Sequence, residues 1–477
     1  MRTNRQTRLF ILNTLLLLLP LLCLQAQVTI GDNKEPEAFS ALELVSNKNT
    51  GLRMPMLTTV ERNAMADTYR SDADKNALAK GLTIYNTTTN CLEFWNGEKW
   101  VSRCVGEVPP YIPEPEDPKV IVTSCIPYMF TYQTINLTVS YTSTPASYLW
   151  VVDGKSVSVD ANFAYTPPAD LALEKDILDN WTKTVEIICQ IEVDGGNVVQ
   201  SKAYEILVVK AEKGTLSPIY VNAVDESNKA LPKIAFAHVN LGDENEINPC
   251  KMGGWLFQWG RVADGHQVRY PKLWPANGQD ASLETIAHDP EDLDANGQVA
   301  EGNDRFGKYI RSFDDPTNIA RWDWRNTHPI NLWGDGELDY HQTKGSGDPC
   351  PQGWKVPSIK QWQSIYHATA NSAAPNIAGA INDWTGLGTF ASNSASGYKL
   401  ANALYLPAAG FRPSYRSPSI LEYVGDAGHY WSGTIHINPL PYYENHLSKR
   451  LIFTKNAVRS NNNAGRADGS SVRCILE

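Results

Sequence analysis

The sequence lacks the features expected of a membrane-spanning, nucleic-acid-binding or zinc-binding protein. Beyond the first 26 residues no stretch is apolar enough to cross a bilayer, which takes roughly 20 residues. No block of basic residues interrupts a chain of net charge −10, and such a chain repels nucleic-acid phosphates. No Cys-x-x-Cys pair is present, and the cysteines are spaced too widely for a zinc cage. We therefore expect no transmembrane segment and no nucleic-acid partner.

Signatures of common enzymes are also missing. The sequence contains neither a Gly-x-Ser-x-Gly elbow nor a His-Glu-x-x-His motif. Residues Gly302–Lys308 imitate a phosphate-binding loop, but Tyr309 stands where a small hydroxyl residue must hold magnesium. We identify no catalytic and no cofactor-binding residue, and expect no enzyme. Paired carboxylates across a glycosidic bond cannot be recognised from sequence, so an extracellular carbohydrate-active enzyme is the alternative.

The first 26 residues have the composition of a secretory signal peptide. Arginines up to Arg8 precede an apolar run that begins at Leu9, and Ala26 offers a small residue for cleavage. The mature chain would then begin at Gln27. Cys23 raises the alternative of a lipoprotein, but leucines stand where a small residue normally precedes a lipidated cysteine. We expect an exported protein whose cysteines form disulfides.

Composition divides the exported chain into four stretches and predicts a multi-domain, mainly β protein. Residues 27–104 contain short alternating apolar runs and predict a β-rich module. Residues 105–118 hold five prolines and four acidic residues, which favour an extended linker. Residues 119–213 are again rich in alternating runs. Residues 214–477 contain all nine histidines and ten of the fourteen tryptophans. Because these residue types are concentrated there, we expect the functional site in this stretch.

A β-hairpin is predicted around the Asn-Gly pair at residues 96 and 97, which supplies the positive φ angles of a tight turn. The resulting register places Trp95 opposite Trp100. It also places Cys91 opposite Cys104, which favours a cross-strand disulfide contributing roughly 3 kcal/mol in the chain-entropy model.

Five short segments occur in order in this first region: Val28–Gly31, Ser40–Leu44, Thr50–Thr59, Gly81–Thr87 and Phe94–Gly97. In that order they resemble a module near the N-terminus of many Bacteroidetes surface proteins. The resemblance implies a lineage and says little about activity.

The second β-rich region predicts an immunoglobulin-like β-sandwich. Apolar residues alternate in Ile135–Tyr141, Ser147–Val152 and Thr184–Val193, and about 95 residues of such strands suit that fold. We expect Cys125 to pair with Cys189, although the first cysteine lies too far from the central tryptophan for the antibody pattern.

In the C-terminal region a short helix is predicted after the cap residue Ser358, because apolar residues follow on one face. The region also contains five further motifs. The motifs are Leu256–His266, Asp348–Pro357, Leu406–Arg412, His429–Thr434 and Ser471–Ile475.

Together these motifs resemble the Fibrobacter succinogenes major paralogous domain, a family common in surface proteins of Bacteroidetes and Fibrobacteres. The family is similar to the C-type-lectin-like fold, including its formylglycine-generating branch. The resemblance implies an α+β lectin-like domain used for binding, with a disulfide between Cys350 and Cys474. The reactive cysteine pair of the oxidase and the calcium tripeptide of the lectins have no match in the domain, so neither activity transfers. Cys250 is then left free, with pairing to Cys350 as the alternative.

A calcium loop is one candidate metal site. Asp292, Asp294 and Asn296 stand at positions 1, 3 and 5 of such a loop and are followed by the turn glycine. The bidentate glutamate of position 12 is replaced by Asn303. A solvated acidic turn is therefore the alternative, and we expect no other cofactor.

Aromatic and arginine side chains in the loops of residues 214–477 are the candidate binding residues, because such side chains dominate interfaces. Core packing is the alternative account for the tryptophans. The candidates are Trp322, Trp324, Trp333, Trp384, Tyr415 and Arg416.

These observations predict a secreted surface protein for adhesion or assembly. Its arrangement is similar to that of accessory or tip subunits of fimbriae, particularly the major fimbrium of Porphyromonas. The implied partners are fimbrial subunits, host extracellular matrix proteins or glycans, and the implied location is the outer cell surface or the fimbrium. A passive structural surface protein is a further alternative.

Overall fold

The computed structural model divides the chain into two compact units, Met1–Pro115 (unit 1) and Glu116–Glu477 (unit 2), which we describe separately. The predicted signal peptide and the predicted linker lie outside the described residues. Within the described part, no helix is long and apolar enough to cross a membrane. The described residues are 28–30, 42–44, 53–103, 121–193, 196–276, 279–312, 322–334, 343–367, 372–414, 420–437 and 446–477.

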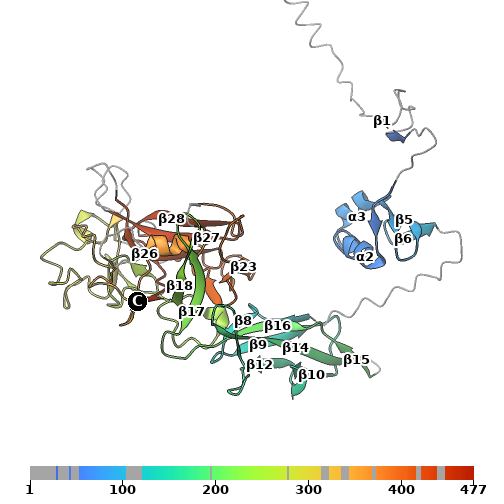
Figure 1. Cartoon of the computed structure of the whole chain (residues 1–477), viewed down its shortest axis with the longest axis horizontal. Helices are drawn as coiled ribbons and strands as arrows, with labels where there is room; N and C mark the ends of the chain where they lie inside the picture. Colours follow the sequence, from blue (N-terminus) through green and yellow to red (C-terminus); the bar gives the residue numbers. More distant parts are fainter. Residues whose placement is uncertain are drawn as a thin grey trace, which may run out of the picture. The chain divides into compact units, whose positions relative to one another are not determined.

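Unit 1 contains a four-stranded sheet and two short helices (Figure 1). Strand β3 runs parallel to β4, and β4, β5 and β6 are antiparallel neighbours. A separate parallel pair precedes this sheet. The elements are β1 (Val28–Ile30), β2 (Leu42–Leu44), β3 (Met56–Leu57), α2 (Thr59–Asp67), α3 (Ala73–Ala79), β4 (Thr83–Asn86), β5 (Cys91–Trp95) and β6 (Trp100–Arg103).

The hairpin of β5 and β6 has the predicted register. Trp95 lies opposite Trp100, and the two indole rings meet edge to face with centroids 5.8 Å apart. Cys91 is disulfide-bonded, while its predicted partner Cys104 lies outside the described residues.

The sequence predicted a β-rich module here and did not predict the two helices that unit 1 also contains. Helix α2 begins with a capping box, in which the Thr58 hydroxyl accepts the Glu61 N–H at 3.2 Å and the Glu61 carboxylate accepts the Thr58 N–H at 2.7 Å. Ala66 and Tyr69 then pack with Trp95 in a small core.

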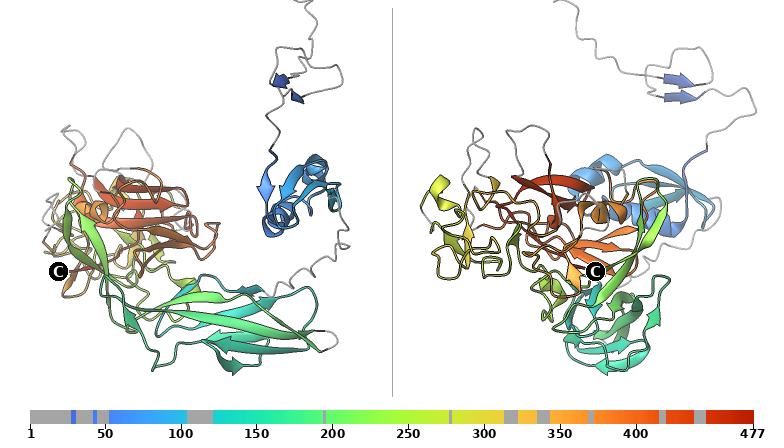
Figure 2. Two further views of the ribbon diagram at one scale, coloured as in Figure 1. Left: turned by 45° about the vertical axis from the view of Figure 1, so that its right-hand side comes forward. Right: turned by 60° about the vertical axis from the view of Figure 1, so that its left-hand side comes forward.

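The first part of unit 2 is a β-sandwich, coloured teal to green in Figure 2. Its strand order is immunoglobulin-like. One sheet has the order β11-β10-β14-β16-β8 and the other β12-β9-β7, with apolar side chains of both sheets forming one core. Its strands are β7 (Ile121–Thr123), β8 (Tyr128–Phe130), β9 (Ile135–Ser140), β10 (Ser147–Val152), β11 (Lys155–Ser158), β12 (Asn162–Tyr165), β13 (Glu174–Lys175), β14 (Trp181–Val193), β15 (Asn197–Gln200) and β16 (Tyr204–Val209).

The predicted Cys125–Cys189 disulfide is wrong. Cys189 is a buried free thiol on β14, directly opposite Trp150. Cys125 lies between β7 and β8 and not on β9, whose inward residue Leu137 occupies the core. Cys125 therefore cannot face Cys189. It pairs with Cys250 instead, with Cα atoms 5.6 Å apart.

The prediction that Cys250 is free is wrong for the same reason, because that cysteine ties the C-terminal domain to the sandwich. The predicted Cys350–Cys474 disulfide is confirmed, with Cα atoms 5.9 Å apart. Cys350 lies just before β22, and Cys474 lies just before the last strand, which pairs with β22.

The C-terminal domain is built from several small sheets, and its first strands meet its last. Strand β30 lies between β18 and β22 in the order β17-β18-β30-β22. The antiparallel sheet β26-β27-β28 carries much of the core. The strands are β17 (Pro218–Val224), β18 (Ala230–Ala237), β19 (Phe257–Gln258), β20 (Lys272–Trp274), β21 (Lys308–Ile310), β22 (Trp354–Lys355), β23 (Trp384–Leu387), β24 (Gly397–Leu400), β25 (Leu404–Pro407), β26 (Ala427–Ile435), β27 (Leu447–Thr454), β28 (Ala457–Gly465), β29 (Gly469–Ser470) and β30 (Ile475–Leu476).

The predicted helix after Ser358 is α4 (Ile359–Ser364). Ser358 and Gln361 form a capping box, and Trp362 is fully buried beneath it. Two 3-10 turns, η1 (Pro249–Lys251) and η2 (Leu283–Thr285), also belong to the described part of the domain. The prediction of a multi-domain, mainly β protein is confirmed, and the lectin-like assignment of this domain stays a prediction.

The sandwich and the C-terminal domain share one hydrophobic core. Tyr128 and Phe130 of β8 pack with Tyr405 and other core residues of the C-terminal domain. The Tyr128 hydroxyl donates to the backbone oxygen of Ala403 at 2.6 Å. Gln133 donates across the same junction to the backbone oxygen of Glu246 at 3.0 Å. The two parts therefore form one continuous body.

Candidate functional site

The four tryptophans predicted to line a binding site lie in two different environments. Trp322 is 44% exposed, whereas Trp324, Trp333 and Trp384 are buried almost completely. Trp324 donates its indole N–H to the backbone oxygen of Trp259 at 2.7 Å, inside the domain. The binding prediction is therefore wrong for the three buried tryptophans, and core packing accounts for them.

Trp322 is the member of the predicted set that the described residues show at the surface. Its backbone oxygen accepts the N–H of Ala467 at 2.9 Å, which holds it against the end of β28. Tyr415 and Arg416, the other two candidates, lie outside the described residues.

The predicted calcium loop is an acidic turn closed by an arginine. Asp292 accepts hydrogen bonds from Arg305 at 2.9 Å and from Asn303 at 2.6 Å. Asp294 accepts the backbone N–H of Asn296 at 2.9 Å. Among the described residues, no group of three or more His, Cys, Asp or Glu side chains is placed to hold a metal ion. A calcium ion would have to displace the guanidinium, so the geometry favours the turn over the metal site.

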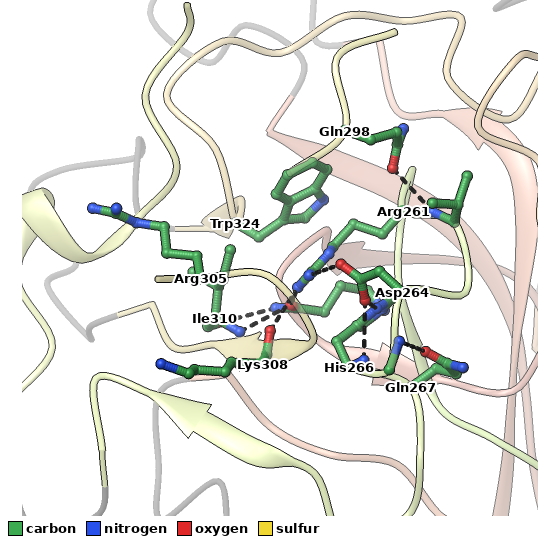
Figure 3. A network of polar contacts seen from close by, with 12 residues as sticks. Arg261, Asp264, His266, Gln267, Gln298, Arg305, Lys308, Ile310 and Trp324 are labelled. Atoms are coloured by element: carbon green, nitrogen blue, oxygen red, sulfur yellow. Dashed lines mark hydrogen bonds and ion pairs between the residues drawn. The ribbon is translucent and has the colours of Figure 1, made fainter. Parts of the chain in front are cut away.

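The motif Leu256–His266 forms a buried polar network inside the C-terminal domain (Figure 3). Arg261 pairs with Asp264, which accepts the Nδ1–H of His266 at 2.6 Å. The Nε2 atom of His266 accepts the backbone N–H of Gln258 at 3.1 Å, so the imidazole is neutral. Burial, and then the nearby guanidinium, lower the pKa of His266 to about 4.

Arg261 is the centre of this network. Its guanidinium also donates to the Gln258 side chain at 2.7 Å and to the Lys308 backbone oxygen at 3.0 Å. It lies 5.3 Å from the centroid of the Trp324 ring. Breaking a buried, paired charge is strongly destabilising. We therefore assign the motif a structural role, because its charged groups are enclosed and satisfy one another.

A hollow runs from the sandwich surface to the place where the sandwich meets the C-terminal domain, and we call it the junction groove. Its smaller part is lined by sandwich residues alone, and its larger part by residues of both domains. Its two adjoining parts, of about 350 and about 880 Å³, share Trp181, Lys210 and Ala211 as lining residues. The sandwich supplies the side made by β13 and the start of β14. Residues 217–220 and Lys233 of the C-terminal domain supply the other side.

Trp181 gives the junction groove an accessible aromatic surface. It is 42% exposed, unlike the tryptophans of the core. The ammonium nitrogens of Lys175 and Lys210 lie 5.5 and 5.7 Å from the centroid of its ring. Ammonium groups at this distance are attracted to an indole face. The groove therefore presents an apolar ring surrounded by positive charge.

The carboxylate of Asp179 is shared by two lysines of the groove. It lies 3.2 Å from Lys233 and 3.6 Å from Lys175, and these ammonium groups lower the pKa of Asp179, Lys233 more strongly. Lys210 has no carboxylate within ion-pair distance among the described residues. Glu212 also lines the groove, so three ammonium groups face two carboxylates.

The sequence did not indicate this groove. Trp181 begins a strand of the sandwich, far from the region in which histidine and tryptophan are concentrated. A tryptophan with lysines on both sides is a weak signal by itself. The larger part of the hollow is lined by residues of two domains, and no local sequence pattern indicates that these residues meet.

Residues 29–109 match the family model for a phage tail like trimerisation region. The match covers the described elements of unit 1 and less than half of the chain. No curated protein matches the chain.

Proposed function

We propose that this chain is a secreted surface protein for adhesion or assembly, and that three copies associate through unit 1. Unit 2 is then the part that binds. The finer assignment is an accessory or tip component of a fimbrium, with fimbrial subunits, host matrix proteins or glycans as partners.

The observation that carries the proposal is the match of residues 29–109 to a trimerisation region. The matched stretch lies within unit 1, one of the two compact units of the chain. Among the described residues of that unit, the core cluster is small and consists of Ala66, Tyr69 and Trp95. Small domains with such cores commonly gain stability from oligomerisation. Association of copies is therefore supported both by the small core of unit 1 and by the match of its sequence to the family model.

Unit 2 suits a binding role because it is a large and rigid body. Its two domains share a core and a disulfide, so a surface that spans them is fixed before a ligand arrives. Linking three such bodies raises the apparent affinity for a surface that carries repeated ligands. A weak site on each copy is then sufficient for adhesion.

The experiment that tests this proposal uses the protein recovered from the cell-surface fraction and from sheared fimbriae. Its N-terminus should lie near Gln27, and light scattering should give three times the mass of one chain. A matched fragment, residues 116–477, should be folded and monomeric. A monomeric mature chain, or a chain that keeps Met1 in the cytoplasm, contradicts the proposal.

The same fragment locates the binding part. A fragment that begins at residue 214 would expose the hydrophobic core that the C-terminal domain shares with the sandwich. Residues 116–477 are therefore the smallest fragment suited to the binding experiment. Immobilised fimbrial subunits and matrix proteins should retain this fragment. Retention of residues 27–109 alone would instead assign binding to unit 1.

A further inference from the structure

The junction groove is a preformed surface with fixed walls. Asn180, at the sandwich side, accepts the Tyr220 N–H at 2.7 Å and donates to the Tyr220 backbone oxygen at 3.0 Å. Lys233 crosses the groove to contact the backbone oxygen of Ile177 at 3.3 Å. The Cys125–Cys250 disulfide fixes the same two domains to each other. A ligand therefore meets the groove without having to order it, which favours binding.

The chemistry of the groove combines an exposed ring with an excess of ammonium groups. Trp181 provides a flat apolar surface of the kind on which sugar rings and other flat apolar groups pack. Lys210 holds its ammonium group over that ring, 5.7 Å from the centroid, without a carboxylate partner among the described residues. Lysine donates three hydrogen bonds from a mobile point charge and binds single acidic groups in several orientations. The best ligand is thus one that carries acidic groups on a ring system.

An extended peptide suits the groove less well. Strand β17 is the edge of its sheet and lines the groove, but its outward N–H groups already have partners. The Tyr220 N–H is taken by Asn180, and the Asn222 N–H donates to Asn382 at 3.2 Å. Peptides that add to a sheet edge need those main-chain groups free. Recognition must therefore come from the ring and the charges.

We propose that the junction groove binds an acidic saccharide. A sugar ring packs against Trp181, and its carboxylate or sulfate pairs with Lys210, with Lys175 and Lys233 adding positive potential. This inference rests on the proposed binding role of unit 2 and does not depend on trimerisation.

The test is calorimetric titration of the mature chain with three hexasaccharides: a hyaluronan fragment bearing carboxylates, a heparin fragment bearing sulfates as well, and neutral maltohexaose. At least one acidic probe should bind about tenfold more tightly than maltohexaose, because charge-assisted hydrogen bonds account for that difference. Raising the salt concentration should weaken binding. If both acidic probes bind, the acid is a carboxylate, and binding of the heparin fragment alone identifies sulfate.

Two variants locate the site. Lys210→Gln and Trp181→Ala should each weaken binding of the acidic probe about tenfold, because each removes one of the two recognition elements. Lys155→Gln, on the exposed strand β11, is the matched control and should bind as the unaltered chain does. Because the Lys210 side chain is exposed, Lys210→Gln should fold normally. It therefore still tests the site if Trp181→Ala unfolds the protein. Unchanged binding in Lys210→Gln, equal binding of maltohexaose, or no binding of either acidic probe overturns the inference, whatever the oligomeric state.

Discussion

The disulfide between Cys125 and Cys250 allows a quantitative test of how unit 2 is held together. It joins the sandwich to the C-terminal domain and closes a loop of 125 residues. The Cys350–Cys474 disulfide closes a loop of 124 residues within the C-terminal domain. The chain-entropy model therefore gives both bridges the same contribution to the free energy of unfolding, about 5 kcal/mol.

The surroundings of the two bridges separate them. Cys125 and Cys250 are half-buried, whereas Cys350 and Cys474 are buried in the core. Serines in the first pair would reach water. Serines in the second pair would bury two hydroxyls, each costing about 1–3 kcal/mol without a partner. We therefore expect Cys125→Ser with Cys250→Ser to cost about 2–5 kcal/mol, and the other double variant to cost more.

The assay is guanidinium unfolding of the 116–477 fragment and its two double variants, followed by tryptophan fluorescence. The variant without the Cys125–Cys250 bridge should still unfold in one transition, because the shared core of Tyr128 and Phe130 continues to couple the domains. Two separated transitions would show that the bridge, and not the core, couples them. Peptide mapping of the oxidised protein that finds Cys125 joined to Cys189 would refute the arrangement itself.

Two further changes test other parts of the chain. Arg62 and Glu93 lie 2.7 Å apart and are both buried. Arg62→Ala should therefore lower the free energy of unfolding of unit 1 by about 3–5 kcal/mol in thermal or urea unfolding, because it removes the counter-ion of the buried Glu93 carboxylate. The control Arg70→Ala removes an exposed ion pair and should cost less than about 1 kcal/mol. His238 should make unit 2 sensitive to acid. Burial, and then a nearby arginine, lower its pKa from 6.5 to about 3, so the folded state binds fewer protons than the unfolded state. Its contribution to stability is therefore lost as the pH falls from 6.5 towards 3, by up to about 1.4 kcal/mol per pH unit. Between pH 6.5 and 4.5 the free energy of unfolding should fall by about 2 kcal/mol less in His238→Gln than in the unaltered chain. The same pH dependence in both proteins would contradict a neutral histidine at this position.

The features predicted correctly from sequence are those set by nearby residues. The Asn-Gly turn determines the register that pairs Trp95 with Trp100. Ser358 caps α4, and its apolar spacing places Trp362 in the core. A similar signal for α2 was available, because Thr58 and Glu61 have the spacing of a capping box. That spacing alone does not predict a helix, because few apolar residues follow on one face of the short segment.

The features predicted wrongly depend on contacts between distant residues. Cys125 has no local property that distinguishes Cys250 from Cys189 as its partner, and the choice is made by how the two domains pack. The tryptophans raise the same difficulty. Trp322 and Trp324 are the same residue type and stand two positions apart, yet the first is exposed and the second is fully buried. Residue type indicates what a side chain can do, and burial decides whether a ligand can reach it.

The motif Leu256–His266, one of the five that carry the family resemblance, has a structural role and identifies no ligand. Arg261, Asp264 and His266 are enclosed and bonded to one another, so this part of the resemblance reports how the domain is held together. The groove around Trp181 lies outside these motifs and depends on a second domain that the resemblance does not cover. A chain can therefore keep the same C-terminal core and change its ligand by changing the domain joined to it. Under the proposals of a saccharide site at the junction and of a trimer, binding specificity belongs to the junction and avidity to the number of copies, while the core motifs hold the domain rigid.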